Sequence, residues 1–291
     1  MIDYEALRAL DAVIRHQSFS KAASELYITQ SAVSQRLRQL EASVGQPLLI
    51  RELPYEATRL GERMLALLRQ VSLLEQTLAD ESQTVTEAKS VVKIAVNVDS
   101  LELWFLSVLK DKELARSLNL SIIVDDEKFT LRHLKAGKVD LCISAEKQPI
   151  QNYESHHLGG MSYVLAATPE FKQRYFPNGL KRAALATSPA VVFNEKDDIH
   201  HRFLRDELGF DGEFPFTAVP SVRGFRTAIL SGFGYGSLPL THIKRELESG
   251  ELVKLQSSII VRDLYLHHWN YQSPLMKRVI TVIQKAARDL K

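Results

Sequence analysis

The stretch "FSKAASELYITQSAVSQRLRQLEASVGQPLLIR", residues 19–51, places apolar residues at helical spacing twice before glycine and proline interrupt the pattern. In its second half the apolar residues recur at intervals of four, three and four: Val33, Leu37, Leu40 and Val44. The first half has an apolar face of its own: Ala22, Ala23, Leu26 and Tyr27. Gly45 is a common kind of helix stop. With the amphipathic segment at residues 4–16, the pattern predicts three short helices.

The third predicted helix carries polar residues opposite its apolar face: Gln30, Ser31, Ser34, Gln35 and Arg38. Two helices joined by a short turn, with small residues at their crossing, are typical of the helix-turn-helix. Glutamine, serine and arginine suit the base edges of the DNA major groove, and a helix N-terminus attracts phosphate. Residues 1–60 hold seven basic and seven acidic residues, so DNA binding would depend on their arrangement. The alternative is a three-helix interaction module with a solvated polar face.

The segment "GQPLLIRELPYEATRLG" reads as a strand followed by Pro54 and by Thr58, which caps a further helix. This pattern predicts a β-wing beside the helices. Arg51 lies at the end of the wing strand, where it would meet phosphate or the minor groove. The plain alternative is an ordinary surface arginine.

A heptad pattern runs along the next predicted helix: Leu60, Met64, Leu67, Val71, Leu74 and Leu78. Such a seam predicts a homodimer that sets two DNA-reading helices on successive half-sites. Additional leucines widen the apolar face, so the helix would also pack against its own DNA-reading module. A helix packed within one chain is the alternative. The polar residues that follow predict a hinge at 80–90.

From residue 91 the chain alternates strand and helix patterns, which predicts an α/β domain with parallel strands. Ligands of such sheets bind beyond the carboxyl ends of the strands. The first strand ends at Asp99 and Ser100, where a hydroxyl and a helix N-terminus suit a carboxylate. The second ends at Asp125, Asp126 and Glu127, which suit an ammonium or guanidinium group unless they form a solvated turn.

Composition limits the remaining classes of function. The 291 residues carry a net charge of +2, with no secretory signal pattern and no apolar run long enough for a membrane span, so we expect a cytoplasmic protein. The single Cys142 is expected to be a buried apolar residue. Three histidine pairs lack the spacing of a metal site within one helix or strand face, so we expect no metal. No nucleophile elbow, phosphate loop or dinucleotide motif is present, so we expect no enzyme and no cofactor.

These residues resemble the LysR-type transcriptional regulators over essentially the whole chain. Residues 19–51 are similar to that family's winged helix-turn-helix, "TRLGERMLALL" to its linker helix, and "LSGFGYGSLPL" to a turn and strand of its effector domain. The motifs "ITQSAVSQR", "GQPLL", "AVNVDSL" and "SGELV" resemble the ArgP/LysG branch, which controls export of arginine or lysine. The resemblance implies an effector domain of two Rossmann-like α/β subdomains, as in periplasmic binding proteins, with dimers commonly paired into tetramers.

The resulting domain prediction has four parts: a winged helix-turn-helix at 1–58, a dimerisation helix at 59–79, the hinge at 80–90 and an effector domain at 91–291. Within the last part, subdomain I spans about 91–163 and 268–291, and subdomain II spans about 164–267. The expected partners are double-stranded DNA, a second copy of the chain, a small-molecule effector and, as a possibility, RNA polymerase.

The predicted effector is lysine or arginine, bound by the two strand ends and by Phe193 of the second subdomain. Arg223 departs from the branch, which has small or acidic side chains there, and an arginine at the ligand would favour an acid instead. Three functions therefore stay open: a regulator of basic amino acid export or metabolism, a LysR-type regulator with an acidic or other effector, and an α/β binding protein or enzyme with a helical oligomerisation module.

Overall fold

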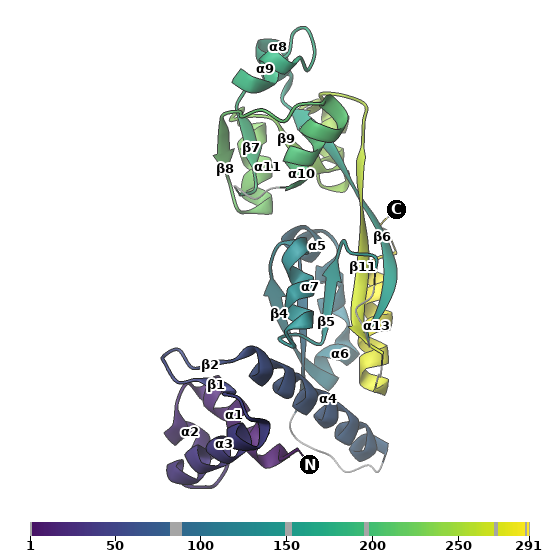
Figure 1. Ribbon diagram of the computed structural model, residues 1–291. Helices are drawn as coiled ribbons and strands as arrows, with labels where there is room; N and C mark the ends of the chain where they lie inside the picture. The colour runs from purple at the N-terminus through teal and green to yellow at the C-terminus, as the bar shows by residue number, and fades with distance from the viewer. Residues whose placement is uncertain are drawn as a thin grey trace. The chain divides into compact units, whose positions relative to one another are not determined.

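The structure, a computed structural model, describes residues 2–81, 89–148, 153–194, 198–270, 273–288 and 290 (Figure 1). The chain forms two compact units. The first comprises Met1–Asn97, Leu109–His156 and Leu266–Ile283, and the second comprises Val98–Val108, His157–Tyr265 and Gln284–Lys291.

The N-terminal part of the first unit is a winged helix-turn-helix. Its elements are α1 (Tyr4–His16), α2 (Phe19–Glu25), α3 (Gln30–Val44), β1 (Leu49–Ile50), β2 (Glu56–Ala57) and α4 (Arg59–Glu81). The side chains of Asp3, Ser18 and Thr29 accept the hydrogen bonds that cap the first three helices. The three helices lie together in Figure 1 and share one hydrophobic core, and β1 pairs antiparallel with β2 to form the wing.

Most of the expected core positions are buried. Val33, Leu37 and Leu40 lie in the helix-turn-helix core with the alanines of α2. Gly45 ends α3 in the left-handed conformation, with φ of 76°. Tyr27 contradicts the expectation that it shares the apolar face of α2: its side chain is 96% exposed because α2 ends at Glu25 and Tyr27 turns away at φ of 54°.

The α/β part of the first unit has three parallel strands. β3 (Ser90–Val96) lies between β4 (Leu118–Val124) and β5 (Leu141–Ser144), with Ile94 opposite both Ile122 and Leu141. Its helices are α6 (Lys112–Ser117), α7 (Glu127–Lys135) and α13 (Pro274–Ala286). The parallel arrangement expected from the alternating pattern is confirmed for these three strands.

The chain between β3 and β4 forms three short helices and not one. The segment breaks into α5 (Val98–Leu103), the 3-10 helix η1 (Phe105–Lys110) and α6. The carboxylate of Asp111 accepts hydrogen bonds from the backbone N–H groups of Glu113 and Leu114 and so begins α6 anew.

The second unit has two cores beside strands β6 (Tyr153–Ala167) and β11 (Ile260–Trp269). Besides α5 and most of η1, its elements are α8 (Pro169–Tyr175), α9 (Arg182–Thr187), β7 (Ala190–Val192), α10 (Asp198–Arg202), the π-helix η2 (Phe203–Glu207), β8 (Phe216–Ala218), α11 (Val222–Leu230), β9 (Gly236–Pro239), the 3-10 helix η3 (Leu240–His242), α12 (Lys244–Ser249) and β10 (Val253–Lys254). β7 pairs parallel with β8, and β6 pairs antiparallel with β9 and β10.

Two long strands, β6 and β11, pass from one unit to the other. The full sheet has the order β10-β6-β11-β5-β3-β4, with β9 also paired to β6. The predicted fold class, an all-α winged helix-turn-helix followed by an α/β effector domain, is confirmed. The predicted domain bounds stay a prediction. The predicted hinge at 80–90 falls mostly outside the described residues.

Candidate functional site

The exposed face of α3 has the side chains that a DNA-reading helix needs. Gln30, Ser31, Gln35 and Arg38 are exposed and Ser34 is half-buried. The Thr29 hydroxyl accepts a hydrogen bond from the Ala32 N–H group at 3.1 Å, which fixes the start of the helix. The predicted polar face is therefore presented on a rigid element, since the opposite side of α3 is locked in the core.

The wing is tied to α3 by Glu41, a residue that the sequence did not single out. Its carboxylate accepts hydrogen bonds from the backbone N–H groups of Leu48 at 2.9 Å and Leu49 at 3.3 Å. Its other oxygen lies 2.8 Å from the guanidinium of Arg51, the predicted wing contact. Burial by itself raises the pKa of Glu41, but the hydrogen bonds from Leu48, Arg51 and Leu49 outweigh it and lower that pKa.

Gly61 brings the linker helix α4 close to the wing. A Cβ atom at this position would lie 2.2 Å from the carbonyl oxygen of Leu48, so only glycine fits. The side chains of Leu65 and Leu68 on the same helix are buried in the helix-turn-helix core. The expectation that α4 also packs on its own DNA-reading module is therefore correct.

The predicted dimer seam lies along α4. Leu60 and Met64 are half-buried against the helix-turn-helix core, and Leu67, Val71 and Leu74 are half-buried. The side chain of Leu78 lies outside the described residues. The seam thus begins at the DNA-reading module and continues away from it.

Asp125 and Asp126 follow β4, as predicted. One Asp125 oxygen lies 2.7 Å from Nε2 of His133, and the other accepts the backbone N–H of Asp126 at 2.8 Å. Asp126 occupies the N-cap position of α7, but its side chain makes no capping hydrogen bond. Both residues are half-buried, and the side chain of Glu127 lies outside the described residues.

Asp99 and Ser100 lie in α5 of the second unit. One Asp99 oxygen accepts a hydrogen bond from the Tyr163 hydroxyl at 2.7 Å, a partner that sequence reasoning missed because it lies 64 positions away. Ser100 is fully buried, and its hydroxyl lies 3.9 Å from the Met161 sulfur. The prediction had set Ser100 at the helix start, but α5 begins at Val98.

The two remaining effector candidates lie in the second unit as well. Phe193 is half-buried against one of the cores of that unit. Arg223 is exposed in the first turn of α11. Arg226, one turn further on, forms an ion pair with the buried carboxylate of Glu246 and so has a structural role.

The two parts of this chain match two known models. Residues 4–62 match the bacterial regulatory helix-turn-helix protein of the lysR family, and residues 87–288 match the LysR substrate binding domain. The chain therefore belongs to the LysR family of transcriptional regulators. It is a DNA-binding regulator with an effector-binding domain and not an enzyme, which removes the third function left open by the sequence.

Within the family, the chain resembles ArgP and LysG. The HTH-type transcriptional regulator ArgP of Vibrio vulnificus is 38% identical over 290 residues, which covers 99% of this chain and 97% of that protein. ArgP of Erwinia tasmaniensis is 41% identical over 95% of this chain and 93% of its own length.

Two solved structures support the same likeness. The crystal structure of ArgP from Mycobacterium tuberculosis has a TM-score of 0.90 and 32% identity, and the match covers 100% of this chain and 99% of that chain. Full-length LysG from Corynebacterium glutamicum, solved with bound effector Arg, has a TM-score of 0.78 and 32% identity over 98% of each chain. In the described residues, no helix is long and apolar enough to span a bilayer.

Proposed function

We propose that this regulator controls genes for the export or metabolism of basic amino acids and responds to arginine or lysine. The observation that carries the proposal is the likeness, over 98% of the chain, to a LysG structure with arginine bound. That likeness supports a response to an amino acid, and we propose the class of regulated genes in addition.

Asp125 and Asp126 are the residues that we propose to receive the cationic end of the effector. His133 and the Asp126 N–H group hold the Asp125 carboxylate in one orientation, so little side-chain entropy is lost when it binds a cation. Asp126 carries its charge at a helix N-cap without the usual capping bond. Two adjacent carboxylates suit a guanidinium, which donates several hydrogen bonds in one plane.

Asp99, Ser100 and Phe193 remain proposed effector contacts that need separate tests. Asp99 is held by the Tyr163 hydroxyl and offers a second source of negative charge for an ammonium group. Ser100 can bind a carboxylate only if its hydroxyl becomes accessible, because that side chain is fully buried here.

An acidic effector is the second candidate, and Arg223 is the observation that favours it. Its side chain is exposed, so its charge is available to an anion. We expect Arg223→Ala to leave arginine binding unchanged if the first candidate is right. If the unchanged protein binds glutamate or aspartate and Arg223→Ala loses that binding, the acidic effector is favoured.

Calorimetry on the full chain with arginine, lysine, glutamate and aspartate tests the proposal directly. We expect a basic amino acid to bind and Asp126→Asn to weaken it by about ten-fold, the loss of one charged hydrogen bond. Glu146→Gln, at an exposed position of the same unit, is the matched control and should bind normally. Binding of an acid and of neither basic residue would overturn the assignment.

We also propose that the regulator acts as a homodimer or homotetramer that assembles through the α4 seam. The half-buried Leu67, Val71 and Leu74 continue the heptad beyond the DNA-reading module. A gel shift with the promoter DNA of a divergently transcribed neighbouring gene tests DNA binding by the assembly. Addition of arginine or lysine should change the affinity or the mobility of the complex, and no response to either would argue against them as effectors.

A further inference from the structure

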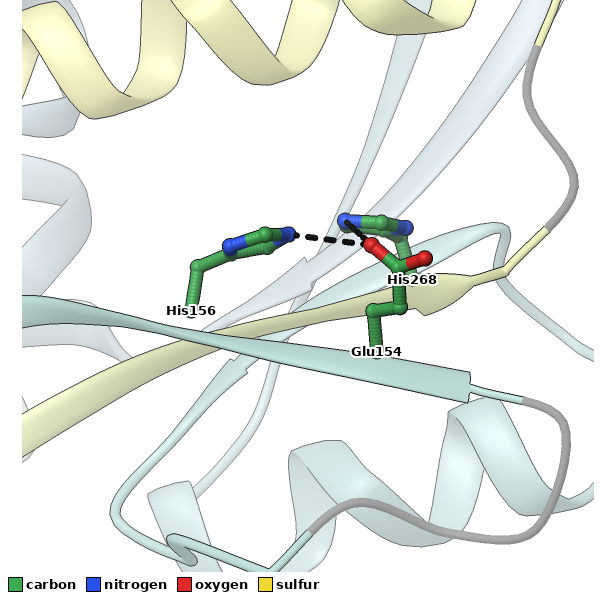
Figure 2. A group of neighbouring side chains, drawn as sticks. All are labelled: Glu154, His156 and His268. Carbon is green, nitrogen blue, oxygen red and sulfur yellow. Dashed lines mark ion pairs between the residues drawn. The ribbon is translucent and has the colours of Figure 1, made fainter.

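Three side chains with metal-ligating atoms meet in the first unit (Figure 2). Glu154 and His156 lie two positions apart on β6, so they point to the same face of the sheet. His268 comes from β11, the neighbouring strand. The ligand atoms of all three lie within 4.8 Å of one another, and in the described part of the chain no other group of three does so.

The distances in this group match a small coordination sphere. Nε2 of His156 lies 3.4 Å from Oε2 of Glu154, and Nε2 of His268 lies 3.9 Å from the same oxygen. A tetrahedral zinc ion bound at about 2.0–2.1 Å holds its ligand atoms roughly 3.3 Å apart. The His156 and Glu154 atoms already have that spacing, whereas His268 would have to move closer when a metal ion binds.

His268 has the tautomer that a metal ligand requires. Its Nδ1 lies 2.7 Å from the backbone carbonyl oxygen of Trp269. Because a carbonyl oxygen can only accept, Nδ1 carries the proton and Nε2 presents its lone pair toward Glu154. In the neutral ring, Nε2 is therefore the nitrogen that would bind a metal ion.

The exposure of the three side chains suits a site that opens to solvent. The His268 side chain is 1% exposed, whereas those of His156 and Glu154 are 37% and 46% exposed. The two imidazole rings are stacked at 20°, with centroids 4.9 Å apart.

We propose that Glu154, His156 and His268 bind a divalent transition metal ion with the chemistry of zinc, with water as the fourth ligand. This revises the sequence-based expectation of no metal, which considered only spacings within one helix or strand. His156 is the last residue of β6 in the first unit, and β11 enters that unit at Leu266. A bound ion would join the two strands beside the points where the chain passes between the units.

Titration of the metal-free full chain with Zn²⁺ in a calorimeter tests this inference. We expect one tightly bound ion per chain, and an affinity at least about ten-fold lower in Glu154→Gln and in His156→Ala. His157→Ala is the matched control, because His157 is the next residue of β6, is exposed and pairs with Asp263 instead. Its affinity should equal that of the unchanged protein.

Thermal melting with and without Zn²⁺ gives a second readout that a folding defect cannot imitate. Binding to the native state raises Tm of the unchanged protein and of His157→Ala. Zn²⁺ should not raise Tm of Glu154→Gln or His156→Ala above the Tm that each variant has without metal. No Zn²⁺ binding at micromolar concentration, or equal affinity and equal Tm shifts in all four proteins, would overturn the proposal.

Discussion

Replacement of Glu41 tests how the wing is held on the DNA-reading helix. Its half-buried carboxylate, 15% exposed, accepts the N–H groups of Leu48 and Leu49 and faces Arg51. In Glu41→Ala, the backbone donors at the start of the wing lose a charged acceptor. In Glu41→Gln, one neutral acceptor remains and the charge is lost.

The geometry sets the size of the effect. A hydrogen bond to a charged group contributes about 1.5–3 kcal/mol to stability, and we assign this full contribution to the 2.9 Å bond from the Leu48 N–H group. The bond from Leu49, at 3.3 Å, is weaker, and Arg51 is 47% exposed, which limits its ion pair to ~1 kcal/mol or less. We therefore expect a local destabilisation of about 2–4 kcal/mol in Glu41→Ala and about half of that in Glu41→Gln.

Hydrogen exchange of the peptide that contains the Leu48 and Leu49 amides measures this local stability. We expect faster exchange there in both variants and no change in Glu52→Gln, an exposed control in the wing. Because the folded pKa of Glu41 is lowered, its contribution is present above about pH 4.5 and is lost as the pH falls through the folded pKa. An unchanged exchange rate in Glu41→Ala would refute this reasoning. So would an exchange rate in Glu41→Gln that depends on pH as it does in the unchanged protein.

Three further predictions concern DNA reading, assembly and acid stability. Gln30→Ala should cost about 1–3 kcal/mol on the cognate site in a gel shift and much less on random DNA. Gln39→Ala, about two and a half turns further along α3 and also exposed, should bind normally. Equal losses on both DNAs in Gln30→Ala would show that Gln30 only positions the protein. Val71→Asp should split the dimer, because two carboxylates would meet in an apolar seam, and light scattering that still reports the original assembly would place the seam elsewhere. Burial, and to a smaller extent the neighbouring His201, lowers the pKa of His200 to about 3. The folded state therefore binds fewer protons than the unfolded state between about pH 6.5 and 3. The protein should lose stability as the pH falls through this range, by up to roughly 1.4 kcal/mol per pH unit. In urea titrations, His200→Leu should reduce this dependence of the unfolding free energy on pH, whereas the exposed His201→Leu should not. The same pH dependence in His200→Leu as in the unchanged protein would contradict the prediction.

The sequence alone determined the winged helix-turn-helix and the class of the second domain. Helix periodicity, the Gly45 stop and the polar face with Gln30 and Arg38 are local features, because a helix repeats every 3.6 residues whatever surrounds it. The strands β3 and β4 were predictable from their short runs of apolar residues, but β3 ends at Val96, before Asp99, which lies in α5. The limit of local pattern appears at Tyr27, where one turn residue with positive φ carries an apolar side chain into solvent.

Only the tertiary structure decided which distant side chains meet. Glu41 reaches the wing because the chain reverses direction after α3, and Tyr163 reaches Asp99 across 64 positions. Glu154, His156 and His268 converge because β6 and β11 are neighbours in the sheet, although 112 positions separate His156 from His268 in the sequence. Strand order and register follow from packing of the whole sheet, and no spacing within either strand encodes them.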